Sequence, residues 1–113
     1  MRIEAVKVGS VMVVEPKERR IDAAAAAAFK ASLIDLILGG ERRIVIDLAA
    51  VDFIDSTGLG AIVSTLKALG QEGELAICNP RETVMNLFRL TRMNRVFEIL
   101  SSREEAVASL NKK

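Results

Sequence analysis

The sequence contains no histidine, and this absence narrows its chemistry more than any other feature of the composition. Histidine is the usual proton acceptor beside a nucleophilic serine or cysteine, a common general base and a frequent metal ligand. The chain also lacks tryptophan and tyrosine, has no more than two adjacent lysines or arginines, and carries a formal net charge of only +1. We therefore predict that it is not an enzyme, that it holds no metal or cofactor, and that it binds no nucleic acid.

Cysteine and long apolar runs are scarce as well. Cys78 is the only cysteine, so no disulfide can form within the chain, which is typical of proteins in a reducing compartment. The opening residues Met1-Arg2-Ile3-Glu4 lack the apolar stretch of a secretory signal, and no apolar run is long enough to cross a bilayer. We therefore expect a cytoplasmic protein without direct membrane insertion.

The hydrophobic pattern predicts alternating strands and helices. Strands are expected at residues 2–8, 11–14, 44–48, 51–54, 75–78 and 96–99, and helices at residues 23–38, 56–69, 80–90 and 102–110. After the first hairpin this order is typical of parallel strands with covering helices. Half of the 113 residues are hydrophobic. We expect a single α/β domain over residues 1–113, with a mixed, mostly parallel β-sheet and about four covering helices.

Helix-capping residues mark three of the expected helix starts. An aspartate or asparagine, or a serine followed three residues later by glutamate, can bond the free N–H groups of a first helical turn. The three patterns are Asp22 before a run of six alanines, Asn79-Pro80-Arg81-Glu82, and Ser102 with Glu105.

Several motifs resemble reactive sites but lack a required part. Asp47 and Asp55 lie near strand ends without a second acid or base, so we expect a capping or turn role for both. Gly58-Leu59-Gly60 matches neither glycine-rich phosphate loop. Ser56 lacks the flanking glycines and the histidine of a nucleophile elbow. Cys78 continues an apolar strand and is expected to be a buried, unreactive thiol.

Ser56 remains as the candidate functional residue. It lies at the expected start of a helix, where the first N–H groups have no partner within the helix. In one interpretation its hydroxyl caps the helix, together with Asp55 or Thr57. In the other it accepts phosphate from a kinase, because a helix N-terminus favours negative charge. The phosphate would add about 1.5 to 2 negative charges to the surface beside Asp55 while the fold is kept.

The helix that begins at Ser56 has few charges on its outer face. Opposite its apolar side come Thr57, Ala61, Ser64 and Ala68, and Lys67 is its only charged residue. Solvent-facing helix surfaces usually carry more charge. These small residues are either a docking surface for a protein partner or a chance result of composition.

Around this helix start the sequence resembles the STAS domains, and in particular the bacterial anti-sigma factor antagonists. The resemblance rests on Ile44-Val45-Ile46-Asp47-Leu48 and above all on Asp55-Ser56-Thr57-Gly58-Leu59-Gly60, and it extends over nearly the whole chain. Arg19-Arg20 and Arg92 depart from residues that are frequent in that family. These departures bear on the choice of partner more than on the switch itself.

The resemblance implies a protein that binds an anti-sigma factor with serine kinase activity and thereby frees a sigma factor. The kinase would use ATP to phosphorylate Ser56 and end the binding, and a PP2C-type phosphatase would restore it. The residues expected at the contact are Asp22, Asp55, Ser56, Thr57, Gly58, Ala61 and Ser64. Two other roles stay open, an accessory subunit of a membrane transporter for lipids or anions and a scaffold component of a stress-sensing complex.

Overall fold

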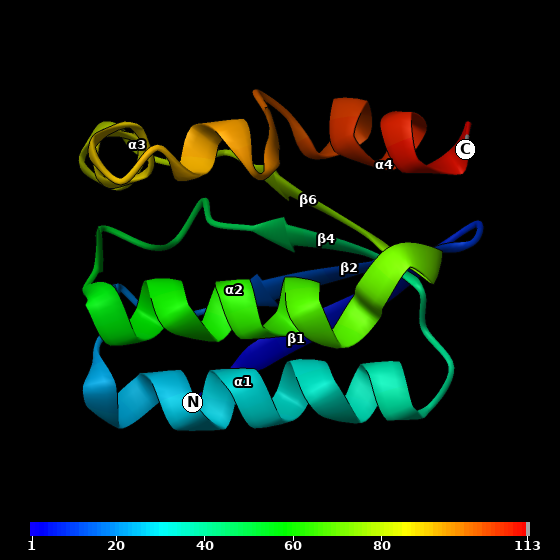
Figure 1. Cartoon of the computed structure of the whole chain (residues 1–113), viewed down its shortest axis with the longest axis horizontal. Coiled ribbons are helices and arrows are strands. Elements are labelled where there is room, and N and C mark those ends of the chain that lie inside the picture. Colours follow the sequence, from blue (N-terminus) through cyan, green and yellow to red (C-terminus); the bar gives the residue numbers. More distant parts are fainter. Residues whose placement is uncertain (113) are drawn as a thin grey trace.

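The computed structural model describes residues 1–112, whose central element is a five-stranded sheet of order β1-β2-β4-β6-β7 (Figure 1). Its strands are β1 (Ile3–Val8), β2 (Val11–Pro16), β4 (Arg43–Asp47), β6 (Glu74–Cys78) and β7 (Glu98–Leu100). β1 and β2 form an antiparallel hairpin, and all other neighbouring strands of this sheet are parallel. The predicted mixed, mostly parallel sheet is confirmed.

Four helices cover the sheet, as predicted from the sequence. They are α1 (Ala23–Leu38), α2 (Ser56–Leu69), α3 (Glu82–Leu90) and α4 (Arg103–Asn111), with short 3-10 turns η1 (Gly70–Glu72) and η2 (Met93–Arg95). α1, α2 and α3 pack on one face of the sheet and α4 on the other. Within residues 1–112, no helix has both the length and the apolar character that crossing a bilayer requires.

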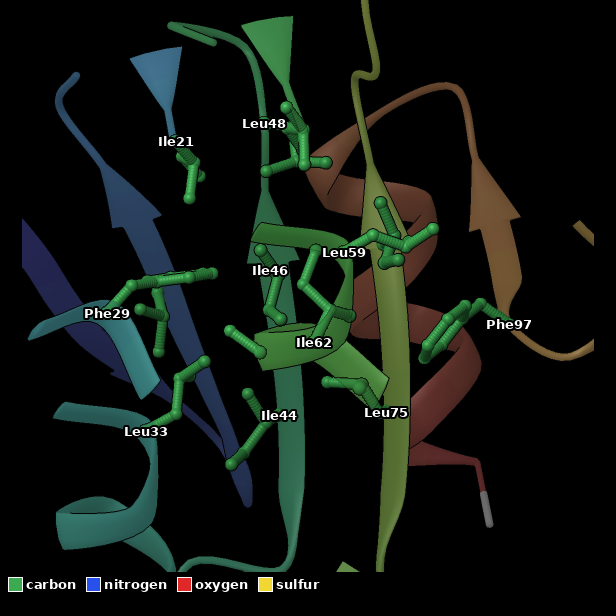
Figure 2. Close-up of a cluster of buried hydrophobic side chains, with 14 of the residues drawn as sticks. Ile21, Phe29, Leu33, Ile44, Ile46, Leu48, Leu59, Ile62, Leu75 and Phe97 are labelled. Carbon is green, nitrogen blue, oxygen red and sulfur yellow. The ribbon is translucent and has the colours of Figure 1, made fainter. Parts of the chain in front are cut away.

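The larger hydrophobic core lies between the sheet and helices α1 and α2. Phe29 and Leu33 of α1 and Ile62 of α2 are fully buried, as are Ile44 and Ile46 of β4. Figure 2 shows these five side chains gathered between the helices and the sheet. Burial of one such side chain contributes about 1.5–3 kcal/mol to stability. This layer therefore fixes α1 and α2, and with them the residues at their N-terminal ends.

α4 is held on the opposite face by apolar contacts and by a partly buried ion-pair network. Ala106 and Leu110 are buried against the sheet. Arg103 Nε donates to Asp47 Oδ2 at 2.9 Å, and Arg103 Nη2 donates to Glu15 Oε1 at 2.6 Å. Asp47 is only 3% exposed and also accepts the backbone N–H two residues further along the chain. The turn role expected for Asp47 is confirmed, and the ion pair adds to it.

The predicted start of α3 is wrong. The helix begins at Glu82, and Arg81 occupies the N-cap position without a side-chain capping bond. Asn79, the expected cap, has a left-handed backbone with φ of 57°. Its side-chain amide donates to Asp47 Oδ1 at 3.1 Å instead. The Asn79 side chain therefore makes a tertiary hydrogen bond in place of the helix-capping bond that the local pattern predicts.

The strand predicted at residues 96–99 is shifted toward the C-terminus. The N–H groups of Val96 and Phe97 both donate to the carbonyl oxygen of Met93, at 3.0 Å each. These two donors are used in the turn around η2, so the strand begins only at Glu98. Phe97 points into the core, where its ring meets that of Phe88 edge to face at 6.1 Å between centroids.

Candidate functional site

A second, two-stranded sheet brings the starts of α1 and α2 together. β3 (Arg20–Ile21) and β5 (Phe53–Ile54) pair in parallel, with Ile21 opposite Ile54. The N–H of Asp55 donates to the Ile21 carbonyl oxygen at 3.3 Å. In Figure 1, α1 and α2 run side by side and both begin at the left end of the molecule. The positive ends of two helix dipoles therefore meet at one place on the surface.

An aspartate caps each of these two helices. Asp22 Oδ1 accepts the N–H groups of Ala24 and Ala25 at 3.1 and 3.2 Å. Asp55 Oδ1 accepts the N–H of Gly58 at 3.0 Å. The capping roles predicted for both aspartates are confirmed. Ser56 is not the cap but the first residue of α2.

The two hydroxyl groups that follow Asp55 differ in their bonding. Thr57 Oγ1 donates to Asp55 Oδ1, so its proton is engaged. Ser56 is exposed, and within residues 1–112 its hydroxyl takes part in no side-chain hydrogen bond. Of the two, only Ser56 presents a hydroxyl that a partner can reach without breaking an internal bond.

The carboxyl group of Asp55 is kept ionised by the same arrangement. Its pKa lies below the ordinary value of 3.8 because the Thr57 hydroxyl and then the Gly58 N–H donate to it. The backbone N–H of Ala23, the first residue of α1, lowers this pKa further. Asp55 therefore places a negative charge beside Ser56 at neutral pH.

An open groove of about 390 Å³ lies between α1 and α2 and reaches the first turn of each helix. Apart from one lysine, its lining residues are small and uncharged, so larger side chains of a partner can enter it. Its lining consists of Ala23, Ala26, Ala27 and Lys30 from α1 and Thr57, Gly60, Ala61 and Ser64 from α2.

Ala61 and Gly58 do not lie on an exposed face, and for Ala61 the sequence-based expectation is wrong. Ala61 is only 4% exposed and belongs to the core, because α1 packs against α2 at this position. It forms the floor of the groove. Gly58 is also buried, and a Cβ there would lie 2.5 Å from the Ile21 carbonyl oxygen. The absence of a side chain at Gly58 therefore allows α2 to pack closely against β3. The accessible members of the expected contact set are Asp22, Asp55, Ser56, Thr57 and Ser64.

Three arginines near the helix starts, Arg19, Arg20 and Arg81, differ in their partners. Arg19 Nε donates to Asp52 Oδ2 at 2.7 Å, and Arg81 Nη1 donates to Asp52 Oδ1 at 2.8 Å. The Arg19 hydrogen bond, with the charges of both arginines, lowers the pKa of Asp52. The Arg20 guanidinium lies 4.3 Å from the centroid of the Phe53 ring, a cation–π pair. Phe53 is 40% exposed, so this pair forms part of the surface.

Phe53 and Lys30 belong to this surface and were not among the residues expected from the sequence. In an extended segment, successive side chains point to opposite faces. Because Ile54 is buried, Phe53 must point outward, and this alternation is the signal that could have identified it. Lys30 follows Ala23 and Ala27 at helical spacing, but only the packing of α1 on α2 shows that these three line a groove.

Comparison with known proteins accords with this geometry. The model of the STAS domain matches residues 2–106. The chain belongs to the STAS domain family. BtrV of Bordetella bronchiseptica, described as a candidate anti-sigma factor antagonist, is 34% identical over 90 residues, which cover 79% of this chain and 78% of BtrV. A crystal structure of a candidate anti-sigma factor antagonist from Thermotoga maritima superposes with a TM-score of 0.89 at 28% identity, covering 96% of this chain and 94% of that one. Within the STAS family, the chain belongs with the anti-sigma factor antagonists.

Two structures of the Bacillus antagonist SpoIIAA share the fold. Its unphosphorylated form matches with a TM-score of 0.72 and 19% identity, over 96% of both chains. Its phosphorylated form matches with a TM-score of 0.73 and 20% identity, over 96% of this chain and 98% of SpoIIAA. The two forms resemble this STAS domain equally well, so SpoIIAA keeps its fold when phosphorylated.

Proposed function

We propose that this STAS protein is an anti-sigma factor antagonist whose binding is switched by phosphorylation of Ser56. The unphosphorylated form binds an anti-sigma factor that is also a serine kinase, and a sigma factor is thereby released. The kinase transfers the γ-phosphoryl group of ATP to the Ser56 hydroxyl, and a PP2C-type phosphatase removes it. The observation that carries the proposal is the exposed, unbonded Ser56 hydroxyl at the paired starts of α1 and α2, beside the groove.

The contact surface follows from the groups around Ser56. The anti-sigma factor covers Ser56 and Thr57 and inserts side chains into the groove between α1 and α2. At the edge of this surface it meets the exposed Phe53 ring with the Arg20 guanidinium on it. Asp22 and Asp55 lie half-buried at the helix starts, where they contribute negative charge to the contact.

A phosphate on Ser56 leaves the fold intact because of where the side chain lies. Ser56 makes no core contact, and the Gly58 N–H of the first turn is already bonded to Asp55. The phosphate therefore stays at the surface, where the helix dipole still favours its charge. The retained fold of phosphorylated SpoIIAA supports this reasoning.

The same phosphate is incompatible with a partner that covers it. In a desolvated interface, a group with about 1.5 to 2 negative charges loses its hydration and repels the ionised Asp55 carboxylate. Charges left without a partner in an interface cost about 2–5 kcal/mol. A loss of about 3–4 kcal/mol weakens binding roughly 10²- to 10³-fold. This is sufficient for a regulatory switch without any change of fold.

A capture experiment tests the proposal. The tagged chain is incubated with an extract of its own cells, with and without ATP, and the bound proteins and the Ser56 peptide are analysed by mass spectrometry. We expect an anti-sigma factor to be retained without ATP and released with ATP, while the Ser56 peptide gains one phosphate. The Ser56→Ala variant is expected to retain the anti-sigma factor under both conditions and to gain no phosphate.

The matched control is Ser10→Asp, at the turn between β1 and β2. In Figure 1 this turn lies at the right end of the molecule, opposite the starts of α1 and α2. Ser10 Oγ accepts a hydrogen bond from Arg43 Nη1 and donates one to Asn111 Oδ1, so a carboxylate there keeps the arginine as a partner and loses the bond to Asn111. Ser10→Asp should bind as the unmodified chain does, whereas Ser56→Asp should bind more weakly. Phosphate found on Ser56→Ala would refute the site. A complex that persists with ATP would instead support a permanently docked subunit.

A further inference from the structure

The turn between α3 and η2 presents two large apolar side chains to solvent. Leu90, the last residue of α3, is 84% exposed, and Val96, just after η2, is 51% exposed. Phe88, two residues before Leu90, and Phe97, directly after Val96, are buried in the core. The fold therefore does not need Leu90 or Val96 for its own packing, and their exposure marks a surface that a partner can cover.

Two unpaired arginines stand between these apolar side chains. Two other arginines of this segment each have a carboxylate partner, Asp52 for Arg81 and Glu82 for Arg89. Within residues 1–112, no carboxylate pairs with Arg92 or Arg95. Their charges are therefore available to an acidic partner.

The backbone of Arg92 adds a second peculiarity to this turn. Its φ is 61°, in the left-handed region that glycine and asparagine adopt more easily than arginine. The side chain makes no ion pair within residues 1–112 that offsets this strain. The structure of the isolated chain thus gives no reason for an arginine at this position.

α3 connects this turn to the surface around Ser56. Thr83 Oγ1 donates to the carbonyl oxygen of Asp52 at 2.7 Å, which fixes the first turn of α3 beside β5. Thr83, Leu87 and Leu90 are spaced by four and three residues and so lie on one face of α3. At 1.5 Å per residue, Leu90 is about 10 Å further along the helix than Thr83. A protein interface of ordinary size covers about 800 Å² on each partner. α3 is therefore the element along which a partner at Ser56 and β5 would extend to this turn.

We propose that Leu90, Arg92, Arg95 and Val96, here called the α3 corner, form a second contact for the anti-sigma factor. An acidic segment of the anti-sigma factor occupies the α3 corner, and its carboxylates pair with Arg92 and Arg95. An apolar pocket beside that segment receives Leu90. The identity of the partner rests on the proposed function. The α3 corner does not include Ser56, so its contact with the anti-sigma factor is independent of phosphorylation at Ser56.

Binding kinetics with the purified anti-sigma factor from the capture experiment test this proposal. The first variant combines Arg92→Gly, which also relieves the positive φ, with Arg95→Gln. We expect its association rate at low salt to fall about three- to tenfold and to depend less on salt, because unpaired surface charges act mainly on association. The second variant, Leu90→Ala, should dissociate about tenfold faster, because a buried apolar anchor acts mainly on dissociation.

The matched controls remove similar groups at the C-terminal ends of α1 and α2. Leu38, the last residue of α1, is 80% exposed, and Lys67 lies in the last turn of α2. Leu38→Ala and Lys67→Gln should bind with unchanged rates. Unchanged rates for Leu90→Ala and for the arginine double variant would overturn the α3 corner.

The Ser56→Asp variant separates this proposal from the switch. If Ser56→Asp weakens binding and the corner variants do not, the switch stands and the α3 corner fails. If the corner variants weaken binding and Ser56→Asp does not, the α3 corner stands and the switch fails. If both proposals hold, Ser56→Asp should lower affinity by the same factor in the corner variants as in the unmodified chain, since distant contacts act additively.

Discussion

Replacing Gly58 by alanine tests how closely the start of α2 is packed against β3. A Cβ at this position would stand 2.5 Å from the Ile21 carbonyl oxygen and 2.8 Å from Ile54 Cγ2. The nearest atom belongs to the backbone of β3 and cannot rotate away, so α2 has to move. That movement would also disturb the hydrogen bond from the Asp55 N–H to Ile21.

Two opposing terms set the size of this effect. Overpacking of a well-packed site costs about 1–3 kcal/mol. Alanine in place of glycine within a helix contributes about 1 kcal/mol in the other direction. We therefore expect Gly58→Ala to lower the free energy of unfolding by up to about 2 kcal/mol.

Gly60→Ala is the matched control, two residues further along the same helix. A Cβ at Gly60 would meet no heavy atom within 4 Å, so only the gain in helix propensity remains. Urea unfolding followed by circular dichroism should give a lower midpoint for Gly58→Ala and a higher midpoint for Gly60→Ala. The two midpoints should differ by about 0.7–2 M if the slope is about 1.5 kcal/mol/M. Equal stabilisation of both variants would refute the close packing of α2 on β3.

Three further predictions concern the rest of the chain. Asp47→Ala should lower the free energy of unfolding by about 1–3 kcal/mol, because the Asn79 amide and Arg103 Nε lose their acceptor while Arg103 keeps Glu15. Glu104→Ala on the exposed side of α4 should have little effect in the same urea titration. Burial raises the pKa of Cys78 to about 12, so iodoacetamide at pH 8 should label it only as fast as the protein unfolds, and rapid labelling of the folded chain would contradict its burial. An NMR titration should show Asp55 ionising below its ordinary pKa of 3.8. The contribution of this carboxylate to stability is therefore present above pH 3.8 and is lost as the pH falls through the lowered pKa. Thr57→Val should raise the pKa of Asp55, and an unchanged pKa would refute the Thr57 hydrogen bond.

Local chemistry was sufficient to predict many features of this STAS domain. Asp22 caps α1 and Ser102 caps α4 through bonds to N–H groups two or three residues away, so a short window of sequence contains both partners. The glycine stop after α1 and the buried strands were likewise predicted from nearby residues. In the candidate site, the same kind of reasoning identified Asp55 and the hydroxyl of Ser56.

The remaining features depend on contacts between distant parts of the chain. The sequence places Ala61 on an outer face of α2 because the apolar stripe of this helix identifies only the side that packs on the sheet. The second neighbour is α1, which buries Ala61 and opens the groove beside it. The pairing of β3 with β5 joins residues more than 30 positions apart, and two-residue strands have almost no pattern of their own. Asn79 failed as a cap because it bonds Asp47, 32 residues earlier.

The affinity of the anti-sigma factor for the phosphorylated chain tests the central claim most directly. The chain is phosphorylated to completion on Ser56 by the purified kinase, its backbone NMR spectrum is compared with that of the unphosphorylated chain, and both dissociation constants are measured by calorimetry. We expect spectral changes confined to the starts of α1 and α2, together with a dissociation constant roughly 10²- to 10³-fold larger. Equal affinities for the two forms would contradict the account, as would a spectrum altered throughout the core.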